Sequence, residues 1–347
     1  MRLALDGTPL LGRPTGIGRY VAGLVAGLVQ RPDPPEITLA AFSLRGDRVT
    51  PPAGTRWSTR RFPARVLQAL WEFGDLPPVE WLTGRCDVFH ATNFVLPPTG
   101  RAAGVVSVHD LSFDQHADTV DTQVLRYQRL VPLGLRRAEV VLTLTETTAG
   151  EVRERYGVDN VMVARPGVDA SWSGPHARPQ GLPAEYVLFV GSVEPRKNLP
   201  VLVQALRRMP GAPPLVLAGP AGWGPELDTT GIEVIRTGYL SEDEVQRVVA
   251  GASVLAYPSR HEGFGLPPLE AFACGVPAVV SDLPVLHEVL GTLPTYVPVG
   301  DAEGLADALR RALEDPGDAA ARRAHAAQWT WERCAAEAMT AYDAALR

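Results

Sequence analysis

The sequence has 347 residues, 46% of them hydrophobic and 21% charged, with a formal net charge of −6 at pH 7. That length exceeds one ordinary hydrophobic core, so we expect two globular domains. The negative net charge supplies no basic field to attract nucleic acid, and no apolar run approaches the roughly 20 residues that cross a bilayer. Composition therefore argues against a nucleic-acid-binding protein and against an integral membrane protein.

The cysteines Cys86, Cys274 and Cys334 are far apart and form no C-x-x-C pair. Free thiols in a reducing compartment are the simplest interpretation, ahead of a disulfide framework or a thiolate metal site. The start, MRLALDGTPLL, lacks the ordered regions of a signal peptide and is expected to form a strand that runs into a loop. We therefore expect a cytoplasmic protein, and a peripheral contact with the cytoplasmic membrane stays open.

The first half of the chain alternates predicted strands and helices. The apolar, continuous strands are typical of a parallel sheet covered by helices on both faces. Strands are predicted at 2–6, 37–42, 56–62, 87–92, 104–110 and 140–145, helices at 17–30, 64–73, 78–83, 121–138 and 146–156, and a closing segment at 161–169.

A Gly-, Pro- and Ser-rich stretch at 170–185 follows, and we predict it to be an interdomain linker. The alternation then restarts, so the prediction is two doubly wound α/β domains, at 1–169 and 186–328, with an amphipathic helix at 329–347. Strands are predicted at 186–191, 214–219, 232–238, 253–259, 277–282 and 295–299, and helices at 198–209, 241–251, 266–274 and 303–314.

Ligands of open parallel sheets bind at the carboxyl ends of strands, so motifs that follow strands matter most. TGIGRY (15–20) opens a helix after the first strand, but Val21 stands where a dinucleotide fingerprint has its third glycine. NAD binding is therefore disfavoured. Backbone N–H groups at this helix start would suit an anion, and a loop that merely caps the helix is the alternative.

Two neighbouring strand ends of the first domain carry polar groups. VHDL places His109 and Asp110 at the end of one strand, and FHATNF places His90 and Asn93 at the end of another. Packing or surface roles are the simpler alternative for such histidines. No D-x-D motif or zinc-type His/Cys spacing occurs in the sequence, so we expect no metal site.

FVGSVEPRKNL follows the first strand of the second domain. Gly191 allows close backbone approach, and Arg196 and Lys197 bring two cations to the same strand end. Lys197 is the only lysine in the sequence, and a GC-rich genome would explain why lysine is scarce elsewhere. Cations at a helix start oppose the helix macrodipole, so a bound anion explains them better than a solvated charge pair does.

SRHEGFGLPPLEAFACGVP (259–277) is the most specific stretch. Gly263 and Gly265 predict a tight turn, prolines suit the first turn of the following helix, and Gly275 suits its C-cap. The helical rise of about 1.5 Å per residue places Glu262 and Glu270 roughly 10 Å apart. That separation is too large for the acid pair of a retaining glycosidase and fits the two ends of a nucleotide sugar.

The wording EGFGLPPLE resembles the E-x7-E motif of family-4 retaining glycosyltransferases of the GT-B fold. Further motifs that resemble the family occur in its order across both halves of the chain. They are TGIGRY, VHDL, RPGVD (165–169), GSVEPRKN, TGYL (237–240) and EAFACGVPAVVSD. The resemblance implies two facing Rossmann-like domains, with the first binding the acceptor, the second binding the donor, and the final helix packing back on the first.

The resemblance assigns a role to each matching residue of the second domain. Glu262 would bind hydroxyls of the transferred sugar, and Glu270 would bind the ribose. Arg196 and Lys197 would neutralise the diphosphate leaving group. Tyr239 and Leu240 would border the base, and Gly191 and Ser192 would lie against the donor. Sugar and pyrophosphate would be held by backbone N–H groups of Gly263, Phe264, Gly265 and Leu266.

In the first domain, the resemblance implies that Gly16 and Gly18 bring backbone close to the diphosphate. His109 would lie beside the reacting carbon and help to position sugar and acceptor. The acceptor itself would meet polar groups at the strand ends. The residues expected there are His90, Asn93 and Asp110.

One position departs from the family pattern. Many members carry arginine directly after the glycine that corresponds to Gly191, and Ser192 stands there in this chain. Arg196 is the residue that could take over this second cationic role. The resemblance further implies retention at the anomeric carbon without metal or other cofactor, through attack from the face that the diphosphate leaves.

The sequence motifs identify the substrates less closely than they identify the class of reaction. SVEPRKN, GYLSEDE and FHATNFVLP resemble bacterial polysaccharide mannosyltransferases, which favours GDP-mannose as donor and leaves UDP-glucose and dTDP-rhamnose open. The acceptor would be a glycan or a lipid-linked glycan. The 60–73 segment mixes arginines with aromatic residues, so it is either an ordinary amphipathic helix or a contact with lipid.

Three other classes remain for comparison. A phosphorylase-like enzyme would need a lysine for a pyridoxal Schiff base, and Lys197 is already placed in the EPRKN turn. A sugar-nucleotide epimerase would not be expected to carry this E-x7-E sequence, EGFGLPPLE. A non-catalytic binding module would be indicated by loss of Glu262, Lys197 or His109, and the sequence retains all three.

Overall fold

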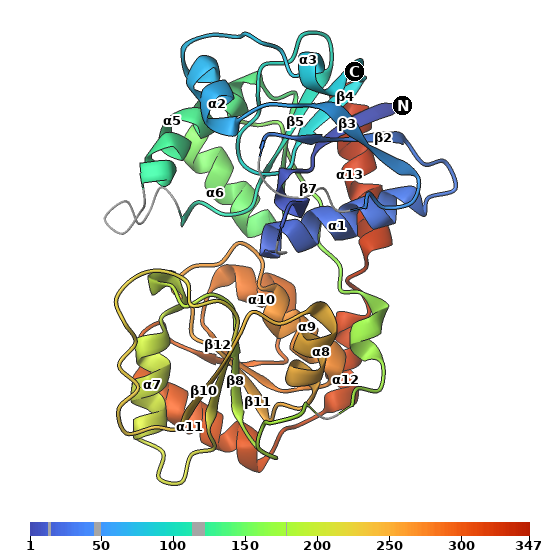
Figure 1. The fold of residues 1–347 in the computed structure, drawn as a ribbon. Helices are drawn as coiled ribbons and strands as arrows, with labels where there is room; N and C mark the ends of the chain where they lie inside the picture. Colours follow the sequence, from blue (N-terminus) through green and yellow to red (C-terminus); the bar gives the residue numbers. More distant parts are fainter. Residues whose placement is uncertain (13–14, 45–49, 113–121, 178) are drawn as a thin grey trace. The chain divides into compact units, whose positions relative to one another are not determined.

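The computed structural model describes residues 1–12, 15–44, 50–112, 122–177 and 179–347. The chain forms two compact units (Figure 1). Unit 1 comprises Met1–Gly167 together with Thr330–Arg347, and unit 2 comprises Val168–Trp329. The chain thus enters unit 2 before the predicted linker. The start of that stretch forms the short helix η3 (Ala170–Ser173), which buries Trp172.

Unit 1 is built on a parallel sheet with the strand order β3-β2-β1-β4-β5-β6-β7. Chain order reverses between β1 and β4, which is the switch point where ligands of doubly wound sheets bind. The strands are β1 (Arg2–Asp6), β2 (Glu36–Ala41), β3 (Thr55–Arg61), β4 (Val88–Ala91), β5 (Ala103–Val108), β6 (Val140–Thr143) and β7 (Val161–Val163).

Helices lie on both faces of this sheet (Figure 1). They are the short η1 (Thr8–Leu10), α1 (Gly16–Val29), α2 (Ala64–Phe73), α3 (Glu80–Thr83), α5 (Thr122–Arg137), α6 (Glu146–Tyr156) and α13 (Trp331–Ala345). The predicted helices at 64–73 and 146–156 match α2 and α6 in both bounds.

The C-terminal helix α13 packs against α1 within unit 1, as the resemblance implies. Small residues on α1 make this approach possible. A Cβ on Gly23 would overlap the indole of Trp331, and one on Gly27 would overlap the Trp331 carbonyl. The glycines of the helix AGLVAGLV are therefore needed for close helix packing.

His90 is a core residue, which corrects its predicted role in acceptor binding. It lies inside β4 with 0% of its surface exposed. Nδ1 is 2.8 Å from the Tyr342 hydroxyl on α13, and Nε2 is 2.8 Å from Ser107 Oγ on β5. Both ring nitrogens are occupied, so His90 ties the sheet to α13 and cannot reach a ligand.

Unit 2 repeats the doubly wound arrangement with the order β10-β9-β8-β11-β12-β13, so its switch point lies between β8 and β11. The strands are β8 (Val187–Val190), β9 (Leu215–Ala218), β10 (Val234–Gly238), β11 (Val254–Tyr257), β12 (Ala278–Ser281) and β13 (Thr295–Val297). The helices are η4 (Pro195–Lys197), α7 (Leu199–Arg207), α8 (Glu242–Ala250), α9 (Leu266–Cys274), α10 (Pro284–Leu290), α11 (Ala302–Glu314) and α12 (Ala319–Ala326).

The sequence prediction did not include α10 and α12. Both are short, and α10 begins with a proline, so neither has a long apolar period that would announce a helix. Tertiary contacts hold them in place. Arg322 of α12 donates through Nε and Nη2 to the Gly275 carbonyl at the end of α9. Across the described residues, every helix is too short or too polar to pass through a bilayer.

Candidate active site

The switch point of unit 2 brings together three of the predicted catalytic residues. Arg196 and Lys197 lie in η4, just after β8, and Glu262 lies in the turn after β11. Because β8 and β11 are adjacent and parallel, both segments leave the sheet at the same edge. Residues about 65 positions apart in the chain are thereby brought into direct contact.

Lys197 is bound on two sides. Its Nζ donates to Glu262 Oε1 at 2.8 Å and to the Tyr257 hydroxyl at 3.0 Å. Only 7% of the residue is exposed. Tyr257 is the last residue of β11 and was not among the predicted site residues, although its place at a strand end was a usable signal.

Arg196 occupies the other carboxylate oxygen. Its Nη1 donates to Glu262 Oε2 and to the His261 carbonyl, each at 3.0 Å, and its Nη2 donates to Glu194 Oε1 at 2.9 Å. Glu262 therefore joins the two cations. Contact of Glu262 with a sugar and of Arg196 with a diphosphate remain predictions.

The electrostatics of the cluster follow from these contacts. Burial opposes ionisation of Glu262, but Lys197 and Arg196 together outweigh it and lower its pKa to about 2. Burial also lowers the pKa of Lys197, against the attraction of Glu262, and Arg196 adds to that lowering. Two carboxylates, Glu262 and Glu194, face the two cations, and a diphosphate could compete with them for Arg196 and Lys197.

The backbone around Lys197 is closely packed. Gly191 has φ +145°, a conformation that side chains disfavour, and a Cβ there would lie 3.3 Å from the Phe189 ring and 3.8 Å from Lys197 Cε. Gly219 has φ +143°, and a Cβ there would clash with the Gly191 carbonyl. The Lys197 side chain therefore lies close to the backbone of Gly191, at a position whose φ value favours glycine.

The turn after Glu262 leads into α9 as predicted. Gly265 is the N-cap with φ +96°, prolines occupy the first turn, and Gly275 is the C-cap with φ +83°. The Phe264 side chain turns inward onto Trp329, with ring centroids 5.3 Å apart. Its contribution to a ligand would therefore be its backbone, at a helix start that favours anions.

The remaining donor-site candidates differ in accessibility. Tyr239 follows β10 and is 38% exposed, so part of its side chain lies at the surface. Glu270 lies inside α9 with 1% exposed, so binding of a ribose would require its neighbours to move. Ser192 and Leu240 are half-buried beside these strand ends.

His109 follows β5 in unit 1 and is nearly buried. Its Nε2 lies 2.7 Å from the Thr92 carbonyl, which can only accept, so Nε2 carries the proton and Nδ1 is left as an acceptor. Burial lowers the His109 pKa, and the ring is neutral at pH 7. A neutral, fixed imidazole suits the predicted positioning role.

The glycines at the start of α1 have separate explanations. The Thr15 side chain caps the helix by accepting from the Gly18 N–H at 3.2 Å. A Cβ on Gly18 would lie 2.6 Å from the Pro9 carbonyl, so packing already requires glycine there. A Cβ on Gly16 would meet nothing within 4 Å, which leaves that backbone open to a ligand.

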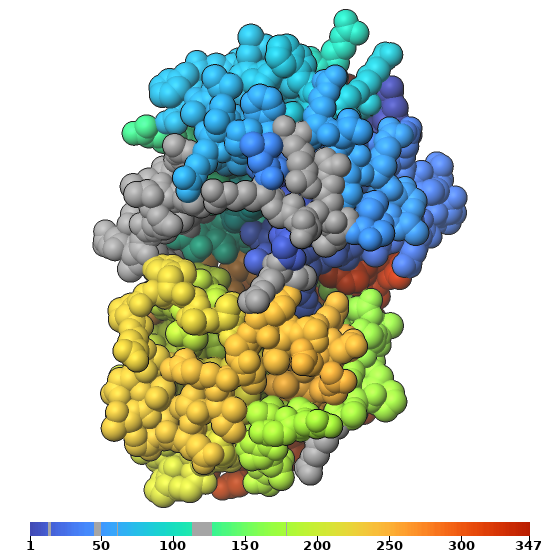
Figure 2. Space-filling model, viewed as in Figure 1, coloured from blue at the N-terminus to red at the C-terminus, as the bar shows by residue number. Residues whose placement is uncertain are grey.

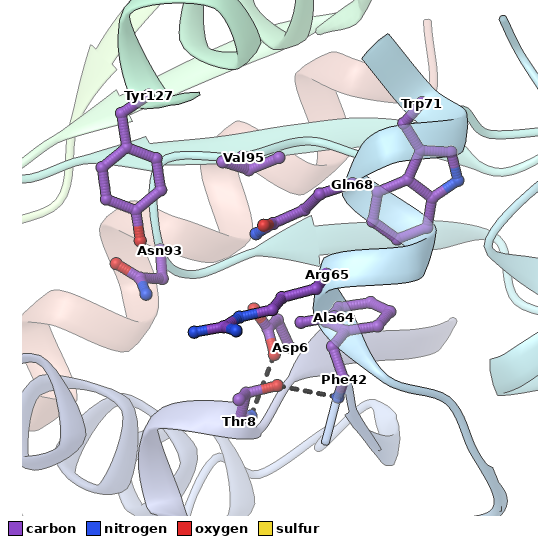
Figure 3. A pocket seen from close by; sticks show the side chains of 10 residues that line it. All are labelled: Asp6, Thr8, Phe42, Ala64, Arg65, Gln68, Trp71, Asn93, Val95 and Tyr127. Atoms are coloured by element: carbon purple, nitrogen blue, oxygen red, sulfur yellow. Dashed lines mark hydrogen bonds between the residues drawn. The ribbon is translucent and has the colours of Figure 1, made fainter. Parts of the chain in front are cut away.

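The two other residues predicted to bind the acceptor, Asp110 and Asn93, differ in their surroundings. Asp110 accepts from Ser112 N and Oγ at 2.9 and 2.6 Å, so it shapes its own loop. Asn93 lines a cavity of about 470 Å³ at the switch point of unit 1 (Figure 3). Asp6, the last residue of the predicted strand RLALD, lines the same cavity and was not predicted as a site residue.

Comparison with known families agrees with this architecture. A family model described as "Glycosyl transferase 4-like domain" matches residues 15–167, and one described as "Glycosyl transferases group 1" matches residues 184–315. The two matches follow each other along the chain. They cover the switch point of unit 2, the E-x7-E stretch and the β4 side of the switch point of unit 1, but not β1.

Curated relatives point the same way. O-antigen chain mannosyltransferase B of Escherichia coli is 28% identical over 282 residues, which cover 74% of this chain and 74% of the relative. Glycogen synthase of Mycobacterium tuberculosis is 30% identical over 291 residues, covering 76% of this chain and 70% of the relative. Both likenesses extend through most of each protein.

Solved structures share the fold over nearly the whole chain. Sucrose-phosphate synthase from Thermosynechococcus elongatus superposes with a TM-score of 0.77 at 19% identity, covering 99% of this chain and 98% of that one. Anabaena HepE in complex with UDP-glucose superposes with a TM-score of 0.70 at 18% identity, covering 97% and 98%. The chain is therefore a hexosyltransferase that belongs to the family-4 glycosyltransferases of the GT-B fold.

Proposed function

We propose that the protein transfers a hexose from a nucleotide-diphosphate sugar to a glycan or lipid-linked acceptor, with retention and without metal. The observation that carries this proposal is the buried Lys197–Glu262–Arg196 cluster at the switch point of unit 2, beside the N-terminus of α9. Two cations and a helix start provide stabilisation for the negative charge that develops on a departing diphosphate. The absence of a D-x-D motif from the sequence supports a metal-independent reaction.

In the proposed reaction, the acceptor hydroxyl attacks the anomeric carbon on the face from which the diphosphate leaves. The new glycosidic C–O bond forms as the bond between the anomeric carbon and the phosphate oxygen breaks. The hydroxyl proton passes to the leaving phosphate oxygen. No protein nucleophile takes part, and the residues of the cluster act by positioning and charge.

For the donor, GDP-mannose is the first choice. The sequences of the motifs SVEPRKN, GYLSEDE and FHATNFVLP favour it, and an O-antigen mannosyltransferase is among the relatives. UDP-glucose and dTDP-rhamnose are the alternatives, and the HepE structure contains UDP-glucose. A thermal-shift panel of nucleoside diphosphates and their sugars tests the choice. We expect selective stabilisation by GDP and GDP-mannose, and selective stabilisation by another base would replace this donor.

The reaction type has its own tests. NMR of the product should show the anomeric configuration of the donor, and an inverted product would reject the front-side route. EDTA should leave the rate largely unchanged. A rate that falls with EDTA and returns with a divalent cation would reject the metal-independent route. An epimerase would instead release an altered sugar nucleotide without needing an acceptor, which the same NMR experiment would detect.

The proposed setting is cytoplasmic, with a contact between unit 1 and the membrane surface. All three cysteines are free thiols, which supports a reducing compartment. Helix α2 buries Leu67 and Trp71 but exposes Val66, Leu70 and Phe73 at helical spacing on its outer side. Its light-blue side chains form part of the face of unit 1 shown in Figure 2. The exposed Arg60, which precedes α2, favours an anionic lipid surface as the partner of this face.

A further inference from the structure

The switch point of unit 1 contains a cavity. It lies at the carboxyl ends of β1 and β4 and has a volume of about 470 Å³. Pockets for small ligands are typically about 300–1,000 Å³. Its lining comes from β1, η1, the segment after β2, α2, the segment after β4, and α5 (Figure 3). The position and size both suit a bound ligand.

One wall of the cavity is apolar and rigid. Phe42 and Trp71 meet edge to face with ring centroids 5.6 Å apart. Trp71 is fixed further because its Nε1 donates to the Pro77 carbonyl at 3.0 Å. Such a wall suits the C–H surface of a pyranose ring.

The other side of the cavity is polar, with donors and acceptors in proximity. Arg65 and Gln68 extend from α2 toward Asn93 and Tyr127 on the opposite side (Figure 3). Tyr127 and Asn93 are themselves linked by a hydrogen bond. Amide, hydroxyl and guanidinium groups around one space can bind several hydroxyl groups at once.

Asp6 lies at the base of this space and is 7% exposed. Its Oδ1 accepts from the Thr8 N–H at 2.9 Å. Among the residues that the structure describes, no cation is paired with the Asp6 carboxylate. A carboxylate has about four acceptor positions, so Asp6 retains the capacity to accept from a ligand.

We propose that this cavity binds the terminal sugar of the acceptor as an uncharged ring, with Asp6 accepting hydrogen bonds from its hydroxyls. The inference rests on the proposed function and assigns its acceptor site to Asp6, Arg65, Gln68, Asn93 and Tyr127. An uncharged sugar supplies hydroxyl donors to Asp6 and hydroxyl acceptors to the amides and Arg65. A phosphorylated or acidic sugar would bring a second negative charge toward a buried carboxylate.

The experiment is saturation-transfer NMR on the full chain. The probes are the methyl α-glycosides of mannose, glucose, galactose and rhamnose, with glucose 6-phosphate as the anionic probe. The variants are Asp6→Asn, Arg65→Gln and, as matched control, Asp33→Asn, which removes an exposed carboxylate of unit 1. Thermal melting of each variant checks the fold, and Gln68→Ala is the second test should Asp6→Asn fail to fold.

We expect at least one neutral glycoside to bind. Asp6→Asn should weaken it by about 10- to 100-fold, the usual effect of a lost hydrogen bond to a charged group. Gln68→Ala and Arg65→Gln should weaken it by several-fold, and Asp33→Asn should have no effect. Binding of glucose 6-phosphate that Arg65→Gln abolishes and Asp6→Asn strengthens would overturn the proposal. Binding of no glycoside, or equal binding in all variants, would overturn it as well.

The pH dependence separates a binding role of Asp6 from a structural one. Burial raises the Asp6 pKa to about 6, against hydrogen bonds from Thr8 that lower it. The charged and titratable side chains that line the cavity with it are Arg65 and Tyr127, and burial raises the pKa of Tyr127. Affinity should therefore rise between pH 5 and pH 7 in the wild type and stay flat in Asp6→Asn.

A separate measurement of nucleotide binding distinguishes failure of the acceptor site from failure of the proposed donor reaction. Loss of glycoside binding with an intact thermal shift by nucleoside diphosphates would reject the acceptor site alone. Glycoside binding that depends on Asp6, without any nucleotide shift, would reject the donor reaction alone. The two tests use different units of the protein and different probes.

Discussion

The two switch points have the same topology and opposite electrostatics. In unit 2, buried Glu262 lies between two cations, and its pKa is lowered to about 2. In unit 1, buried Asp6 accepts from Thr8, no cation in the described part of the chain pairs with it, and burial raises its pKa to about 6. Topology thus brings strand ends together in both units, and the side chains decide which ligand chemistry each edge can serve.

This difference in charge matches the two substrates of a transfer reaction, the donor and the acceptor. The cationic edge of unit 2 suits a diphosphate, whose charge changes as the reaction proceeds. The polar, weakly charged cavity of unit 1 suits an alcohol, which must be held in place without competing charges.

The largest effect is expected at the cationic edge. Lys197→Ala should reduce transfer by about 10³-fold, because it removes a preorganised positive charge from the leaving group. The control is Arg208→Ala, which removes an exposed cation of the same unit. Rates should be measured with saturating donor, with circular dichroism as a check on the fold. Transfer near the wild-type rate would remove Lys197 from the site.

Lys197→Arg tests whether the shape of the cationic group matters in addition to its charge. Charge is preserved, but a planar guanidinium is wider than an ammonium, and the residue is only 7% exposed with its side chain beside Gly191. Transfer should fall by about 10²-fold. Arg208→Lys is the matched exchange at the surface and should be neutral. Full activity of Lys197→Arg would mean that charge alone matters.

Stability should change in opposite directions at the two carboxylates. Glu262 has a folded pKa below its unfolded value of 4.5, so its contribution is present above pH 4.5 and is lost toward pH 2. Asp6 has a folded pKa above 3.8, so its ionisation costs stability increasingly as pH rises from 3.8 to 6. At pH 8, Glu262→Gln should destabilise by about 3 kcal/mol and Asp6→Asn should stabilise by about 2–3 kcal/mol.

Urea unfolding at pH 8 and pH 3 checks both signs. The stabilisation by Asp6→Asn should vanish at pH 3, where both states of the wild type are protonated. The loss in Glu262→Gln should shrink at pH 3 without vanishing, because its folded pKa is about 2. Changes of the same sign in both variants would contradict the contrast between the two edges.

A smaller effect is expected at Tyr257. Tyr257→Phe removes the hydroxyl that accepts from Lys197 at 3.0 Å, and transfer should fall by about tenfold. Tyr186→Phe is a fitting control, since it removes a buried hydroxyl that donates to the Val248 carbonyl in the same unit. That control should lower the unfolding free energy but not the rate of transfer. If Tyr257→Phe transferred the sugar as fast as Tyr186→Phe, the Tyr257 hydroxyl would have a purely structural role.

The smallest effect concerns the surface of unit 1. Phe73→Ser should weaken binding to vesicles of phosphatidylglycerol and phosphatidylcholine by about 5- to 10-fold, because 87% of Phe73 is exposed for contact with lipid. Trp223→Ser changes an exposed aromatic residue of unit 2 and should not alter vesicle binding. Sedimentation with vesicles measures both. Equal binding of the two variants would leave α2 without a membrane role.

Local patterns in the sequence determined much of this protein. Alternation of apolar strands and helices predicted both doubly wound sheets, which the structure and the GT-B relatives confirm. Prolines and Gly275 predicted α9 at 266–274 with both of its ends. The strand-end rule led to Lys197 and Glu262, because each lies next to its own strand in the chain.

Tertiary structure alone decided which of these groups meet. The contact between Lys197 and Glu262 joins two segments that only sheet pairing brings together, and the same is true of the cavity around Asp6. His90 appeared as a strand-end ligand, but its distant partner Tyr342 on α13 makes it part of the core. Periodicity and caps act over a few residues and are written in the local sequence, whereas burial and pKa depend on neighbours that are distant in the chain.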